Sequence, residues 1–104
     1  MPARSSDWSV TIDIRGRAGT VTYREGRDSL ELYWEMAGGR EALAYVSGPP
    51  PQDWDRSAPW VSGRREQVMR RVAAEVVRQS APRSDAEFGD DFSTILITMP
   101  AGSR

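Results

Sequence analysis

Apolar and polar residues alternate along four short segments in the first half of the chain. From Trp8 to Arg15 every second residue is apolar and the residues between them are polar, which is the pattern of a strand with one buried face. The same alternation runs through 20–24, 29–36 and 42–46, with glycine-containing turns between the segments. Short turns between half-buried strands predict a four-stranded antiparallel meander. The charged residues expected on its polar face are Asp13, Arg15, Arg24, Glu31 and Glu35.

The segment from Ser62 to Gln79 has a different period, that of an amphipathic helix. At about 100° per residue, its apolar side chains fall on one arc and most of its charged side chains fall on the opposite arc. Ser62 is expected to be the N-cap, and Pro82 follows the last helical residues. Because valine has a low helix propensity, this valine-rich helix needs a sheet to pack on. The apolar arc comprises Val68, Met69, Val72, Ala73, Val76 and Val77.

Between these two regions, Ser47–Val61 contains four prolines and two tryptophans and has no helical or strand period. We expect a long ordered loop that begins with a stiff polyproline-type extension. After the helix, alternation returns at Asp85–Phe88 and Phe92–Met99, which predicts a short strand and a longer one. The residues of the longer strand expected to face the core are Ile95, Ile97 and Met99.

The predicted fold class is therefore α+β, with the element order ββββαββ. It combines a four-stranded antiparallel meander, one amphipathic helix packed on the sheet and a C-terminal strand pair. A chain of 104 residues is long enough for one core, so we expect a single domain over 7–99 with flexible tails at 1–6 and 100–104. The pattern does not predict the order of the strands in the sheet.

Composition excludes several kinds of chemistry. The chain has no cysteine and no histidine, and all fourteen basic residues are arginine, so a disulfide, a thiolate metal site and a histidine or lysine catalyst are excluded. We expect no catalytic residue, no metal and no cofactor. The absence of lysine indicates a GC-rich, bacterial genome. No apolar run is long enough for a membrane span or a signal peptide, which predicts a cytoplasmic protein without a membrane partner.

The helix carries the most distinctive candidate surface. Between Gly63 and Gln79 there are five arginines and two glutamates, in a chain whose net charge is -1. A guanidinium-rich face can bind nucleic-acid phosphates or an acidic protein surface. The alternative is a solvated face with ordinary ion pairs, since Glu75 lies within helical reach of two of the arginines. The candidate binding residues on the polar side are Arg64, Arg70, Arg71 and Arg78.

Arg65 differs from these arginines because it falls inside the apolar arc near the start of the helix. It could anchor an anionic ligand, or pair with Asp53 or Asp55 while its stem covers apolar surface; we favour the structural pair. Trp54 and Trp60, the two tryptophans of the loop, are candidate recognition residues. They could instead close the open end of the core.

Carboxylates offer a weaker candidate site. Glu31 and Glu35 lie four residues apart on a predicted strand, roughly 13 Å, which is wider than glycosidase pairs need. The acidic residues at 85–91 could provide oxygen ligands for Ca²⁺ or Mg²⁺. Their spacing does not match an EF-hand loop, and aspartates after a glycine are common in turns.

Three functions remain after these exclusions. We favour a small bacterial protein-interaction module without enzymatic activity, which uses the arginine-rich helix face and the Pro/Trp loop. The first alternative is nucleic-acid binding through the arginines, although the net charge does not favour it. The second is a carboxylate-based metal-dependent binder or enzyme. The partner is an unknown protein or a second copy of the chain, since a meander leaves an edge strand free for self-association.

Overall fold

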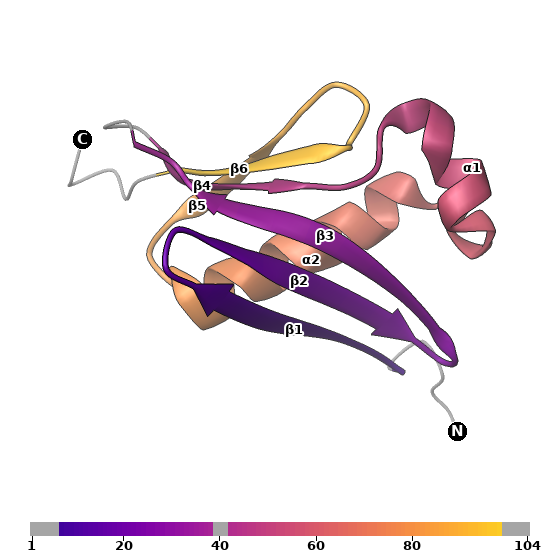
Figure 1. The fold of residues 1–104 in the computed structure, drawn as a ribbon, viewed down its shortest axis with the longest axis horizontal. Coiled ribbons are helices and arrows are strands. Elements are labelled where there is room, and N and C mark those ends of the chain that lie inside the picture. Colours follow the sequence, from indigo (N-terminus) through magenta and orange to yellow (C-terminus); the bar gives the residue numbers. More distant parts are fainter. Residues whose placement is uncertain (1–6, 39–41, 99–104) are drawn as a thin grey trace.

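The computed structural model describes residues 7–38 and 42–98. Within them, six strands form one antiparallel sheet in the order β1-β2-β3-β4-β6-β5 (Figure 1). The first four strands are the predicted meander, and the C-terminal pair extends it, with β6 next to β4. The α+β class and the order ββββαββ are confirmed. The strands are β1 (Trp8–Arg15), β2 (Ala18–Glu25), β3 (Asp28–Met36), β4 (Ala42–Ser47), β5 (Asp85–Phe88) and β6 (Thr94–Thr98).

One long helix, α2 (Arg65–Ser80), crosses one face of this sheet, as Figure 1 shows. Three short helical segments precede it: η2 (Pro51–Asp53), α1 (Trp54–Ser57) and η3 (Pro59–Val61). Among the described residues, no element covers the opposite face of the sheet. The charged residues expected on that open face are all exposed there, as predicted.

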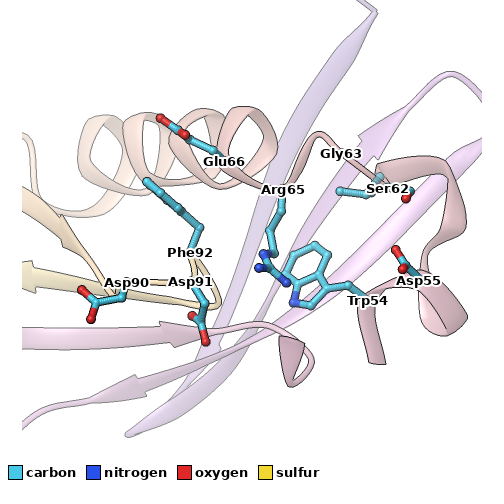
Figure 2. Close-up of a pocket in the computed structure, with 10 residues that line it drawn as sticks. Trp54, Asp55, Ser62, Gly63, Arg65, Glu66, Asp90, Asp91 and Phe92 are labelled. Atoms are coloured by element: carbon cyan, nitrogen blue, oxygen red, sulfur yellow. The ribbon is translucent and has the colours of Figure 1, made fainter. Parts of the chain in front are cut away.

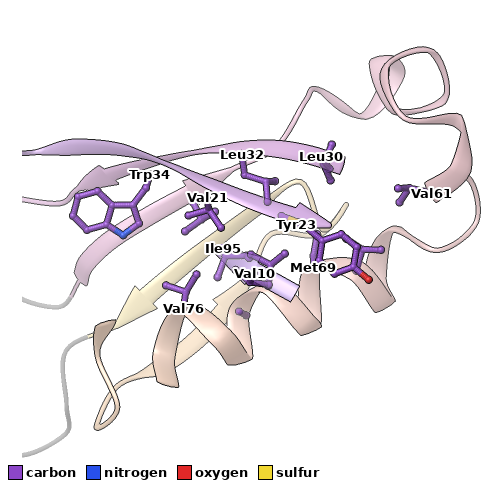
Figure 3. Packing of buried hydrophobic residues seen from close by; sticks show 14 of the residues in the cluster. Val10, Val21, Tyr23, Leu30, Leu32, Trp34, Val61, Met69, Val76 and Ile95 are labelled. Atoms are coloured by element: carbon purple, nitrogen blue, oxygen red, sulfur yellow. The ribbon is translucent and has the colours of Figure 1, made fainter. Parts of the chain in front are cut away.

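The core forms where the apolar rows of the sheet meet the helix. Because the strands are in register, inward-facing side chains line up across them, as in the row Trp34, Val46 and Ile95. Figure 3 shows the sheet residues facing Met69 and Val76 of α2. Full burial of each large apolar side chain contributes roughly 1.5–3 kcal/mol. The core residues of α2 are Val68, Met69, Val72, Ala73 and Val76, all of which the helical period predicts.

The start of the helix differs from the prediction. Ser62 is not the N-cap: its N–H donates to the carbonyl of Pro59 and it ends η3. Gly63 then takes a left-handed conformation, with φ at +78°, which glycine adopts without steric penalty. The helix therefore starts two residues later than predicted, with Arg64 rather than Ser62 at the N-cap position and no side-chain capping hydrogen bond.

Three further expectations need correction. The segment after β4 is not a loop without periodic structure, because it winds into η2, α1 and η3. The last strand starts at Thr94, since Phe92 is left-handed with φ at +58° and cannot continue a strand. The alternation places Met36, at the end of β3, on the apolar side together with Trp34, but Met36 is 43% exposed. Met99 and the tails predicted to be flexible lie outside the described residues.

Candidate functional site

Two of the predicted arginines are bound to a carboxylate of the same chain. Arg64 Nη2 donates to both carboxylate oxygens of Glu25, at 2.9 and 3.0 Å. Arg71 Nη1 donates to Tyr23 Oη at 2.8 Å and to Glu25 Oε1 at 3.3 Å. The Tyr23 hydroxyl donates in turn to Glu25 Oε1 at 2.5 Å. We call these four residues, Tyr23, Glu25, Arg64 and Arg71, the Glu25 cluster.

Aromatic rings enclose the Glu25 cluster. The Tyr23 ring is stacked between Trp8 and Trp60, with ring centroids 6.0 and 6.1 Å away. The Arg71 guanidinium lies 5.0 Å from the centre of the Trp8 ring, and its side chain is only 18% exposed. Trp60 is half-buried in this stack, so it seals one end of the core rather than forming an exposed aromatic surface.

The electrostatics of the Glu25 cluster favour its ionised pairs. The hydrogen bond from Arg64 lowers the pKa of Glu25 below its ordinary value, against the effect of burial. The same bond raises the pKa of Arg64. Burial, followed by the hydrogen bond to Glu25, raises the pKa of Tyr23. The phenol therefore stays neutral and donates its proton to a carboxylate that stays ionised.

The two remaining arginines of the polar side form local pairs along the helix. Arg70 Nε donates to Glu66 at 2.9 Å, and its guanidinium lies over the rings of Phe88 and Phe92. Arg78 pairs with Glu75 at 2.7 Å, as the spacing predicts. Both arginine side chains are more than half exposed. Such surface pairs are screened by solvent and contribute little to stability.

Trp54 belongs to the core, with only 3% of its surface exposed. Its indole N–H donates to Ser93 Oγ at 3.2 Å, which ties α1 to the turn before β6. Gly48 permits this close packing, because a Cβ there would lie 2.8 Å from the Trp54 ring. Of the two roles open to Trp54 from the sequence, the structure shows the closing of the core.

Arg65 does not pair with Asp53 or Asp55 in the described structure, contrary to the pairing favoured from the sequence. Its guanidinium lies 5.6 Å from the centre of the Trp54 ring, a cation–π contact. Asp53 pairs instead with Arg56. Within residues 7–38 and 42–98, the donors of Arg65 have no hydrogen-bonded acceptor, and its position in the apolar arc is explained by the stacking on Trp54.

Arg65 lies in a hollow that brings together three separate parts of the sequence. Figure 2 shows the guanidinium next to the Trp54 ring, with Asp55 on one side and Asp90 and Asp91 on the other. The hollow has a volume of about 450 Å³ and is open to solvent. We call it the Arg65 hollow; it is lined by Trp54, Asp55, Val61, Ser62, Gly63, Arg65, Glu66, Asp90, Asp91 and Phe92.

The charges of the Arg65 hollow are mostly negative, with four carboxylates around one guanidinium. Two of the carboxylates have internal partners: Glu66 binds Arg70, and Asp91 Oδ1 accepts the N–H of Ser93 at 2.9 Å. Asp55 and Asp90 are exposed and have no hydrogen-bond or ion-pair partner in the described part of the chain. The hollow therefore presents free acceptors on two of its sides.

The turn that carries Asp90 and Asp91 has an uncommon backbone. Phe92 is the only non-glycine residue with a positive φ among those described. Bulky residues rarely adopt this conformation, which is stabilised here by packing of Phe92 on Phe88 at 5.3 Å between ring centroids. Strain of this kind is concentrated at functional sites, and an observed outlier supports a hypothesis of function.

Among the described residues, no three carboxylates are placed to hold a metal ion. Asp85 and Glu87 lie on β5, whereas Asp90 and Asp91 lie in the following turn at the Arg65 hollow. Glu31 and Glu35 are exposed on the open face of the sheet. The carboxylates considered from the sequence therefore do not gather at one site.

Sequence reasoning missed the partners of the arginines. Glu25 lies between two alternating segments, where the sequence predicts only a turn, and nothing in its local pattern indicates two guanidinium groups 39 and 46 residues away. Phe92 and Ser93 were expected to be ordinary strand residues. The Asp-Asp sequence before them was the available signal, since an aspartate often accepts the N–H two residues later and so marks a turn.

Comparison of the chain with models of known protein families, with curated proteins and with solved structures found no match. None of the helices in the described ranges has the length and apolar content that a membrane crossing requires.

Proposed function

We propose that this chain is a protein-interaction module without enzymatic activity, whose Arg65 hollow receives a basic segment of a partner protein. The observation that carries the proposal is the combination of two exposed carboxylates without internal partners, Asp55 and Asp90, on the two sides of a guanidinium stacked on a buried tryptophan. The hollow joins the Pro/Trp loop and the start of the arginine helix.

A basic partner fits the charges of the hollow. Arginine side chains pair with carboxylates through two parallel hydrogen bonds, and complementary charges guide the encounter of two proteins. Arg65 adds donors that can bind backbone carbonyl groups of the same segment. The half-buried Phe92 ring provides aromatic contact area of the kind that is enriched in protein interfaces.

The rigidity of the site also supports recognition. Trp54 is held by Ser93, and Ser93 by Asp91, so the floor and one wall of the hollow are connected through hydrogen bonds. A preformed surface loses less conformational entropy when a partner binds. The hollow is therefore a preformed surface rather than an exposed loop without internal hydrogen bonds.

Nucleic-acid binding has less support from the contacts of the arginines. Arg64 and Arg71 would have to leave Glu25 before they could contact phosphates, and Arg70 and Arg78 each have a glutamate partner. Phosphate binding through this face would therefore replace existing charge pairs rather than use free cations.

The test is a titration of the full chain with a hexa-arginine peptide, followed by calorimetry at low salt. Asp55→Asn combined with Asp90→Asn should weaken binding by about tenfold or more, since each lost charge pair contributes on the order of 1 kcal/mol. The matched control is Glu31→Gln with Glu35→Gln, which removes two exposed carboxylates from the open sheet face and should leave the affinity within about twofold.

Equal weakening by the two double variants would contradict the proposal, because it would show general attraction to negative charge. Preferential binding of a hexaglutamate peptide or a single-stranded oligonucleotide would also contradict it, and would favour an anionic partner for the arginines.

A further inference from the structure

Strand β1 is an eight-residue edge of the sheet without proline or glycine. Gln79 Nε2 donates to the Val10 carbonyl at 3.0 Å from the helix side, so this carbonyl points away from β2. Because the N–H and C=O of one residue point the same way and alternate along a strand, those of Trp8, Ile12 and Ile14 also point outward. Apart from the Val10 carbonyl, these outward backbone groups have no hydrogen-bond partner among the described residues, so the edge offers a row of groups for pairing.

A second hollow runs beside this edge, between β1 and α2. It has a volume of about 440 Å³ and lies at the Trp8 and Val10 end of the strand. At the other end of the same strand, Ile14 is 37% exposed although it belongs to the apolar side of the alternation. The hollow, which we call the β1 groove, is lined by Trp8, Ser9, Val10, Glu75, Arg78 and Gln79.

We propose that β1 pairs antiparallel with β1 of a second copy of this chain, with Thr11 opposite the partner's Thr11 on a two-fold axis. This register places Trp8 opposite the partner's Ile14 and Val10 opposite the partner's Ile12. The exposed isoleucine of each copy then enters the β1 groove of the other, and the outward backbone groups of both edges exchange hydrogen bonds.

Charge and packing together select this register over its neighbours. It places Asp7 opposite the partner's Arg15, two opposite charges, and Asp13 opposite the partner's Ser9. Sliding by two residues toward the N-terminus places Asp13 opposite the partner's Asp7, which is repulsive. Sliding by two in the other direction places Trp8 opposite the partner's Gly16, which has no side chain to pack.

Pairing requires only small changes in each copy. The Val10 carbonyl exchanges the bond that it accepts from Gln79 for one from a backbone N–H of the partner strand. Arg15 exchanges its exposed contact with Asp13, 3.4 Å long, for the partner's Asp7. Since the interface is the same patch on both copies, the assembly closes as a dimer and does not grow into fibres. The opposite edge, β5, has only four residues and offers little length for pairing.

The test uses the absence of cysteine from the chain. In the Thr11→Cys variant, the two sulfurs meet at the axis, where facing Cβ atoms are about 4.5–5.5 Å apart, close to disulfide geometry. Oxidised glutathione should convert most of this variant into a covalent dimer. Thr22→Cys is the matched control, since Thr22 lies opposite Thr11 on β2. In the proposed dimer the two Thr22 residues are three strand spacings apart, roughly 14 Å, which is too far for a disulfide.

Light scattering of the untreated full chain should show a dimer at micromolar concentration. Ile14→Lys should raise the protein concentration at which half of the dimer dissociates by about tenfold or more. Arg15→Asp should have the same effect. Adding Asp7→Arg to Arg15→Asp should restore the dimer. A monomer at every concentration, equal cross-linking of the two cysteine variants, or failure of the double charge exchange to restore pairing would overturn the proposal.

Discussion

At the scale of single residues, Glu25 accepts hydrogen bonds from Tyr23, Arg64 and Arg71 at the same time. The cluster joins the end of β2 to the start and the second turn of α2, and its arginines are 34% and 18% exposed. Hydrogen bonds to a charged group at this degree of burial contribute more than surface pairs do, about 1.5–3 kcal/mol. Two arginines that the sequence presents as ligand-binding residues therefore have a structural role.

The Glu25 cluster predicts a pH dependence of folding stability. Because the folded-state pKa of Glu25 is lowered, its contribution is present above the unfolded value of about 4.3 and is lost as the pH falls through the folded value. Glu25→Gln should lower the free energy of unfolding at pH 7 by about 1.5–3 kcal/mol. Its stability should also fall less steeply than that of the wild type as the pH decreases below about 5.

Urea unfolding between pH 3 and pH 7 measures both effects. Glu31→Gln, at an exposed position on the open face, is the control and should change stability at pH 7 by no more than about 0.5 kcal/mol. If the free energy of unfolding changed with pH in the same way in the wild type and in Glu25→Gln, the charge of the Glu25 cluster would not contribute to stability.

Gly48 predicts a second effect at the residue scale. A methyl group there would meet the Trp54 ring at 2.8 Å and Leu32 at 3.0 Å, so Gly48→Ala should destabilise the fold by about 1–3 kcal/mol through overpacking. Gly38→Ala is the matched control, because a Cβ at Gly38 has no neighbour within 4 Å. Denaturant unfolding of both variants measures the difference, and equal stabilities would contradict the packing of Trp54 against Gly48.

At the scale of elements, alternation along the sequence predicts the strands well, because each strand has one buried face. The stretch from Trp8 to Arg15 is a strand with the predicted bounds. The order of the strands could not be predicted, since the same pattern in β5 and β6 suits an edge or a centre. The helical turns around Trp54 were missed because they are too short for a 3.6-residue period to be visible.

The start of α2 provides a prediction at the element scale. Ser62→Ala should change the free energy of unfolding by less than about 0.5 kcal/mol, because Ser62 lies outside the helix and caps nothing. Loss of a true N-cap serine would cost about 0.5–2 kcal/mol. Thermal and urea unfolding of this variant distinguish the two values, and a loss above about 1 kcal/mol would support the capping role expected from the sequence.

At the scale of the whole molecule, the surfaces left free by folding are separate. The Arg65 hollow lies where the loop, the helix start and the turn before β6 meet, whereas the β1 groove lies along the first edge of the sheet. The open face carries Tyr33, 50% exposed, and Tyr45. The sequence indicated Trp54, Arg65 and the aspartates separately, but only the fold brings them together, since they are contributed by three different segments.

The most direct test of the proposed function is a two-dimensional NMR titration of the labelled full chain with the hexa-arginine peptide. Saturable shifts are expected at the Trp54 indole N–H and at the backbone amides of 54–66 and 90–92. The amides around Tyr33 and Tyr45 on the open sheet face serve as the internal reference and should stay unchanged. Shifts that are confined to the open face, or are equal over all acidic surfaces, would contradict a role for the Arg65 hollow in partner recognition.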